Sequence, residues 1–138
     1  MSIHLHLSSV SQENRTHTST IAYDTLVRAG ASCRSIFVAA HNAEVTEAHT
    51  ATCSRGVRII ADAALADLSE TQLADILVIP GGAKGAETLS QNADVQGLIR
   101  RHLEENKIVG MICAGTSRFS YFEKCHMKDT KKNKNWMF

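Results

Sequence analysis

The chain has 138 residues, of which 43% are hydrophobic and 21% are charged, and its formal net charge is +1. This length is enough for one domain with a buried core but is short for two. A net charge so close to zero creates no global field that would attract nucleic acid. No apolar run approaches the length of a membrane-spanning helix. Composition therefore favours a globular protein and argues against nucleic-acid and membrane partners.

The cysteines and the first ten residues indicate the cellular compartment of the protein. The four cysteines, Cys33, Cys53, Cys113 and Cys125, have no C-x-x-C spacing and are too sparse for a disulfide scaffold. The first ten residues have neither a basic segment nor a continuous apolar core, so they do not read as a secretory signal. We therefore expect a cytoplasmic location, with the nucleus as a second compartment.

The first half of the chain alternates between strand and helix patterns. The predicted elements are a strand over 1–10, a helix from 19 or 20 to 29, a strand over 33–40, a strand over 57–60 and a short helix over 61–74. His4 and His6 share one face of the first strand, but no third ligand is spaced to complete a metal site. We therefore predict no metal.

The centre of the chain predicts a strand, helix, strand unit. The runs 76–79 and 107–112 are aliphatic and bounded by turn residues, as in parallel strands that are covered on both faces. Asn92 is a suitable cap for the helix between them, in which apolar residues recur at helical spacing. His102 is predicted to be an exposed residue of this helix. The chain is therefore predicted to be an α/β protein with a mostly parallel sheet.

Cys113 stands where the second of these strands ends. Ala114 and Gly115 follow it, and such small residues are needed where a nucleophile is held on a sharp turn from strand to helix. The sulfur would lie at the carboxyl edge of the sheet, where open α/β sheets bind ligands. Its position beside the first amides of a helix would stabilise a thiolate. An inert buried cysteine is the alternative interpretation.

Residues 80–82, which we call the PGG turn, end the preceding strand at the same edge. Two glycines allow the backbone to approach a reacting group. The amides of Gly81 and Gly82, together with that of Ala114, are candidate donors to an oxyanion. The sequence thus predicts a cysteine nucleophile that faces backbone donors.

The segments ILVIPGGAKGAETLS and ICAG, taken together, resemble the ThiJ/PfpI superfamily, and within it the branch of the parkinsonism-associated deglycase (DJ-one). The resemblance extends back to residues 24–30 and to the Cys53-Ser54-Arg55 triplet, and it covers roughly residues 18–116. It implies a flavodoxin-like, doubly wound, mostly parallel sheet with flanking helices, and it implies no cofactor.

The same resemblance implies roles for further residues. Arg28 and Arg55 correspond to residues that bind an anion or substrate near the interface of a homodimer. Thr18 stands where the family carries an acidic residue that tunes the cysteine. Threonine can donate a hydrogen bond, so it is a possible proton partner, but it cannot act as a general base.

The implied activity is cysteine-dependent handling of small reactive aldehydes. In the family this is a glutathione-independent glyoxalase of the glyoxalase III type, a lyase that converts methylglyoxal to lactate, or a related deglycase. The alternative is a non-catalytic sensor of oxidative stress or a chaperone-like protein that acts through oxidation of Cys113. Because Thr18 replaces the acidic residue of the family, the third alternative is a chain in which this activity is impaired.

The pattern changes after Ser117. The later strands and the histidine of the family are not found, and His126 does not match that histidine in context. From residue 124 the chain is basic, polar and aperiodic. We therefore predict a C-terminally truncated domain over 1–122 and a basic, disordered tail over 123–138, and we hypothesise an alternative ending of the transcript.

Overall fold

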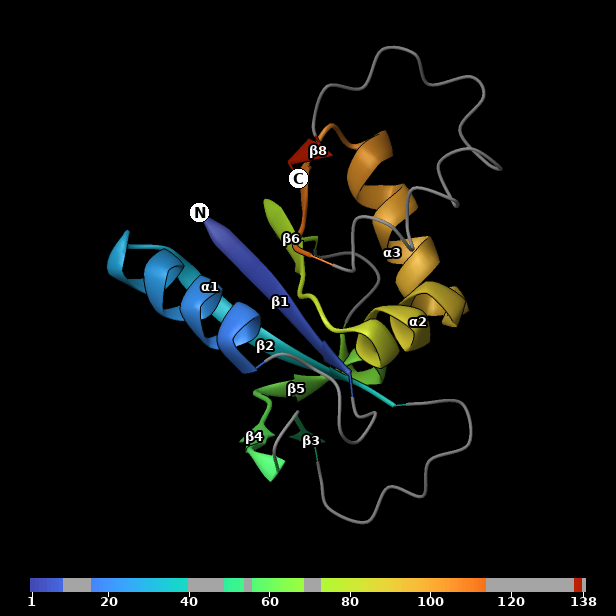
Figure 1. Cartoon of the computed structure of the whole chain (residues 1–138). Helices are drawn as coiled ribbons and strands as arrows, with labels where there is room; N and C mark the ends of the chain where they lie inside the picture. The colour runs from blue at the N-terminus through green and yellow to red at the C-terminus, as the bar shows by residue number, and fades with distance from the viewer. Residues whose placement is uncertain (9–15, 40–48, 54–55, 69–72, 114–135, 138) are drawn as a thin grey trace.

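The computed structural model describes residues 1–8, 16–39, 49–53, 56–68, 73–113 and 136–137 (Figure 1). In chain order the elements are β1 (Ser2–Ser8), α1 (Thr16–Arg28), β2 (Ser32–Val38), β3 (Thr50–Thr52), β4 (Arg58–Ile60), β5 (Ala63–Ala64), the 3-10 helix η2 (Leu65–Asp67), β6 (Ile76–Ile79), α2 (Ala83–Gln91), α3 (Ala93–Glu104), β7 (Ile108–Met111) and β8 (Trp136–Met137). None of the helices in these ranges is long and apolar enough to cross a membrane.

The main sheet has six strands in the order β5-β2-β1-β6-β7-β8, and every neighbouring pair runs parallel. Strands β3 and β4 form a separate antiparallel pair. Strand β1 lies between β2 and β6, so the chain winds outwards from it in both directions. The predicted α/β class with a mostly parallel sheet is therefore confirmed.

Helices cover both faces of the sheet, and β6 shows how the two faces divide. Leu77 and Ile79 belong to the core that is packed by α2 and α3, whereas Ile76 and Val78 belong to the core that is packed by α1. Figure 1 shows α1 apart from α2 and α3, across the sheet. All four side chains are buried, as expected for a central parallel strand. The first core consists of Val38, Leu77, Ile79, Leu89, Val95, Leu98, Ile99, Leu103, Val109 and Met111.

The predicted cap of α3 is confirmed. The side-chain oxygen of Asn92 accepts hydrogen bonds from the amides of Asp94 at 3.0 Å and Val95 at 3.1 Å. Two of the amides that a helix start leaves unsatisfied are thereby bonded. This fixes the direction in which α3 leaves α2, and so the face that it buries against β7.

Two predictions were wrong. The segment predicted as a helix over 61–74 instead contributes the short strand β5, which pairs with β2, followed by η2. The carboxylate of Asp62 binds the amide and hydroxyl of Ser35, both at 2.7 Å, and this holds the segment extended along β2. His102, predicted to be exposed, is fully buried on α3, where its Nδ1 lies 2.8 Å from the carbonyl oxygen of Leu98.

Strand β8 was not predicted. Its two residues, Trp136 and Met137, lie within the segment interpreted as a tail, yet they pair in parallel with Val109 and Gly110 of β7. The boundary predicted at 122 lies outside the described residues.

Candidate functional site

Cys113 lies at the carboxyl edge of the sheet, immediately beyond β7. The amide of Ile112 donates a hydrogen bond to the carbonyl oxygen of Ile79 at 3.1 Å, so the pairing of β7 with β6 continues to the residue before the cysteine. The end of β7 is therefore held beside the PGG turn, which follows β6. The cysteine itself is exposed, whereas Gly81 and Gly82 are buried.

Gly81 packs directly against Cys113. A Cβ placed on Gly81 would lie 2.6 Å from the Cβ of Cys113, 2.9 Å from the carbonyl oxygen of Ile112 and 3.4 Å from Sγ. Contacts below about 3 Å do not occur between such atoms, so no side chain larger than hydrogen fits here. The backbone of the turn consequently approaches the thiol with no side chain between them, as the sequence predicted.

The backbone at Cys113 is in the left-handed region, with φ of 57°. For a residue with a Cβ this conformation costs about 1–2 kcal/mol. Strained backbone of this kind is typical of nucleophiles held on sharp turns, and it persists only where the surroundings enforce it. Here the enforcing contacts are the strand pairing at Ile112 and the packing against Gly81.

Helix α2 begins next to this contact. Gly82, with φ of 127°, is its N-cap and supplies no side-chain cap, and the helix starts with the bond from the amide of Ala86 to the carbonyl oxygen of Gly82 at 2.8 Å. The first amides of a helix carry partial positive charge. The start of α2 therefore adds electrostatic support for an anion beside Cys113. The sequence predicted glycine donors at this position but not the helix start, although the small residues after the PGG turn are a usable signal for it.

The other predicted site residues are placed differently. Thr18 lies in the first turn of α1, which follows β1, so the topology brings it to the same carboxyl edge as Cys113. Arg28 ends α1 at the opposite edge, shortly before β2 begins with the bond from the amide of Ser32 to the carbonyl oxygen of Met1. It is exposed and pairs with Asp24, one turn earlier in the helix, at 2.8 Å. Ala114 and Arg55 lie outside the described residues.

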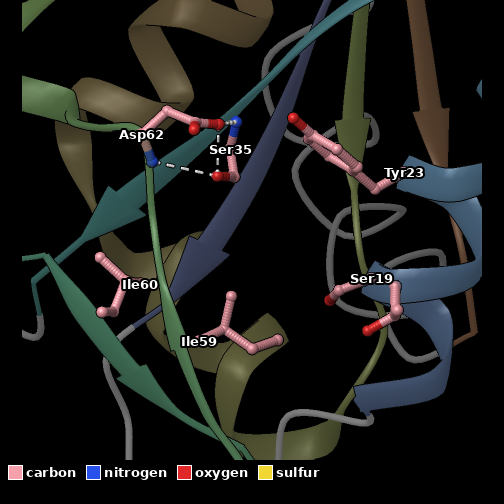
Figure 2. Close-up of a pocket in the computed structure, with 7 residues that line it drawn as sticks. Ser19, Tyr23, Ser35, Ile59, Ile60 and Asp62 are labelled. Atoms are coloured by element: carbon pink, nitrogen blue, oxygen red, sulfur yellow. Dashed lines mark hydrogen bonds between the residues drawn. The ribbon is translucent and has the colours of Figure 1, made fainter. Parts of the chain in front are cut away.

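A cavity of about 360 Å³ lies between α1 and β4 (Figure 2), and none of its lining residues belongs to Cys113 or the PGG turn. The cavity is therefore a feature of the α1 face that is separate from the candidate reaction site.

Comparison with known proteins identifies relatives of this chain. The model of the DJ-1/PfpI family matches residues 10–122. The chain is 51% identical over 43 residues to "Glutathione-independent glyoxalase DJ-1" of Schizosaccharomyces pombe. This aligned stretch is 30% of this chain and 22% of that protein. It is 35% identical over 63 residues to "Glutathione-independent glyoxalase DJR-1.2" of Caenorhabditis elegans. This second stretch is 46% of this chain and 33% of that protein.

Solved structures agree on the fold. Oxidized DJ-1 of Toxoplasma gondii superposes with a TM-score of 0.74 at 24% sequence identity, covering 87% of this chain and 60% of that one. The chain thus spans less than two thirds of each of these relatives.

Proposed function

The chain belongs to the DJ-1/PfpI family, and we propose that it uses Cys113 as the nucleophile in a cofactor-independent conversion of methylglyoxal to lactate, or in related deglycation. The matched relatives that are named as glutathione-independent glyoxalases support this proposal. The observation that carries it is the direct packing of Gly81 against an exposed Cys113 whose backbone is strained.

The first step is addition of the thiolate to the aldehyde. A bond forms between Sγ and the aldehyde carbon, and the electron pair of the carbonyl moves onto its oxygen. The amides of Gly81, Gly82 and Ala114 are the proposed donors to this oxyanion, and the start of α2 adds to the stabilisation. Protonation of the oxyanion then gives a hemithioacetal.

The second step moves a proton between two carbons. A base removes the proton from the carbon bonded to sulfur, which gives an enediol, and protonation of the neighbouring carbon gives the thioester of lactate. Water hydrolyses the thioester and releases lactate and the thiolate, so the net change is methylglyoxal plus water to lactate. Thr18 is the proposed proton partner, and because a threonine hydroxyl cannot serve as a general base, solvent must accept the proton. We therefore expect slow turnover.

The placement of Arg28 supports a homodimer. In its own chain Arg28 lies at the edge of the sheet opposite Cys113. A role for Arg28 in an anion site beside Cys113 therefore requires a second copy of the chain. Four large apolar side chains are exposed on α1 and on or beside β4, namely Ile21, Val27, Val57 and Ile60. Association would remove such apolar side chains from water. We propose that Arg28 and Arg55 act across this interface, in a cytoplasmic protein.

Lactate formation tests the proposed activity. The full chain and its Cys113→Ala variant are incubated with methylglyoxal, and lactate is followed by NMR spectroscopy. We expect lactate only from the parent chain. Equal slow rates in both samples would show that the cysteine does not carry the reaction.

Oxidation of Cys113 is the alternative function, and its exposure supports it. Mass spectrometry after mild peroxide treatment distinguishes the two functions. Selective conversion of Cys113 to the sulfinate, in a chain that produces no lactate, would assign the protein to redox sensing and not to aldehyde chemistry.

A further inference from the structure

A tight turn joins α3 to β7, and His102 takes part in closing it. The amide of Asn106 donates a hydrogen bond to the carbonyl oxygen of Leu103 at 3.1 Å, and the amide of Lys107 donates one to the carbonyl oxygen of His102 at 2.7 Å. Asn106 has a left-handed backbone, with φ of 56°, which is a common way for a helix to end. The backbone of His102 therefore holds the residue that precedes β7.

The side chain of Lys107 ties the same turn to the segment before β6. Its Nζ donates a hydrogen bond to the carbonyl oxygen of Leu73 at 3.1 Å and lies 3.6 Å from Oδ1 of Asp75. The amide of Ile108 also donates to the carbonyl oxygen of Asp75, at 3.1 Å. The end of α3 and the starts of β6 and β7 are thus joined at one edge of the sheet, and Cys113 lies at the opposite edge.

The imidazole of His102 is buried with only one of its two nitrogens bonded. The residue is 0% exposed, and Leu98, Ile99 and Leu103 of the same helix belong to the core. Nδ1 lies 2.8 Å from the carbonyl oxygen of Leu98. Because a carbonyl oxygen can only accept, Nδ1 carries the hydrogen of the neutral ring. Nε2 is then unprotonated, and it has no hydrogen-bond partner in the described part of the chain.

A proton on Nε2 would place an unpaired positive charge in the core, which is strongly disfavoured. Burial has the largest influence and lowers the pKa of His102 below its ordinary value of 6.5, and the positive charges of Lys107 and Arg101 add to this effect. The bond to Leu98 and the negative charge of Glu105 act in the opposite direction. The balance keeps the buried ring neutral, and an exposed ring takes up a proton more readily.

We propose that His102 is a pH-sensitive latch, which holds the end of α3 against the start of β7 at neutral pH and releases it in mild acid. A neutral ring stays in the core, and its backbone carbonyl keeps the bond to Lys107. A protonated ring gains hydration by leaving the core through unwinding of the last turn of α3. The unwinding breaks that bond and uncovers Leu103 and Val109, which are 4% and 0% exposed. Cys113, at the opposite edge, is not moved.

Hydrogen exchange of the full chain, followed by NMR between about pH 7.5 and about pH 5, tests the latch. Below about pH 6.5 the released state takes up a proton that the closed state resists, so its population rises by up to about tenfold per pH unit. Protection of the amides of Asn106 and Lys107, corrected for intrinsic exchange, should therefore be constant above about pH 6.5 and fall accordingly below it.

A low concentration of guanidinium chloride distinguishes local release from global unfolding. Local release exposes little surface, so exchange of Asn106 and Lys107 should not respond to the denaturant. The amides of β6, which pairs on both sides, should be better protected at every pH and should respond to it. Protection in the turn that does not change with pH would overturn the proposal. Equal protection and equal denaturant dependence in the turn and in β6 would also overturn it, because they indicate global unfolding alone.

Two variants remove the titrating ring in different ways. His102→Leu places an apolar side chain in the core, and His102→Gln keeps an amide that can donate to Leu98; in both, protection of Asn106 and Lys107 should no longer depend on pH. The matched control is His17→Gln, because His17 is an exposed histidine of α1, and this variant should retain the full dependence. A fall in protection that persists in either His102 variant would assign the effect to another group and refute the latch.

Discussion

Replacing Gly81 by alanine tests the contact on which the candidate site depends. The new Cβ would lie 2.6 Å from the Cβ of Cys113 and 2.9 Å from the carbonyl oxygen of Ile112. Neither atom is the end of a flexible side chain, so the turn or the end of β7 must move. The φ of Gly81 is not in the left-handed region, and the cost is therefore steric. Overpacking of this kind typically costs about 1–3 kcal/mol.

Gly81→Ala is expected to lower both the thermal stability of the chain and the reactivity of Cys113. For a chain of this size, about 2 kcal/mol corresponds to a fall in Tm of roughly 6–10 °C. Displacement of the turn also moves the amides away from Cys113, so lactate formation should fall by at least about tenfold, since one misplaced oxyanion donor typically costs more than that. Thermal denaturation and the lactate assay measure the two effects on the same protein.

Gly97→Ala is the matched control. Gly97 lies within α3, and a Cβ there would meet nothing within 4 Å. Alanine should stabilise the helix by about 0.8–1 kcal/mol and leave reactivity unchanged. If Gly81→Ala melted with the parent chain and kept its activity, the close approach of the PGG turn to the cysteine would be refuted.

Three further predictions follow from the described contacts. Cys113→Gly should be more stable than Cys113→Ala by about 1 kcal/mol in denaturant titrations, because glycine adopts the positive φ without strain; equal stability would show that this backbone is not strained. Burial lowers the pKa of His102 below its ordinary value of 6.5, so the unfolded chain takes up a proton that the folded chain resists. Stability should therefore be complete above about pH 6.5 and decline as the pH falls below it, and His102→Leu should reduce this decline, as denaturation at a series of pH values would reveal. Asn92→Ala should cost about 1 kcal/mol, whereas Asn92→Asp should retain most of the cap; similar losses in both variants would contradict the capping role.

Much of the architecture could be predicted because local patterns and tertiary structure agree. The run Ile76–Ile79 is a strand with the predicted bounds, and Asn92 caps α3 as its residue type suggests. The position of Cys113 at a strand end, opposite two glycines, follows from the same agreement, since parallel strands end at one edge of a sheet.

The remaining features depend on contacts distant in sequence. The segment around Ala63 has helical composition. It is held as a strand by hydrogen bonds between Asp62 and Ser35, two residues that are 27 positions apart in the chain. His102 is buried because its face of α3 meets the sheet, and a single histidine at a helical position does not reveal this. Nor could the sequence indicate that Ser19 and Asp62 line one cavity, because their helix and strand segments are brought together only by folding.

The proposed site divides into a part that one chain builds alone and a part that would require a second copy. The strain at Cys113 is held by the pairing of Ile112 with Ile79 and by contact with Gly81. Ile79 belongs to the buried core on the side of α2 and α3, whereas Ile112 packs against the core on the side of α1. Arg28, in contrast, is exposed at the far edge and bound to Asp24. The intrinsic reactivity of the thiol therefore depends on the sheet of one protomer, whereas any anion site that uses Arg28 depends on association. If the proposed homodimer places Arg28 in an anion site, loss of association is expected to weaken substrate binding and to leave the oxidation of Cys113 intact, because Cys113 and Arg28 stand on opposite edges of one sheet.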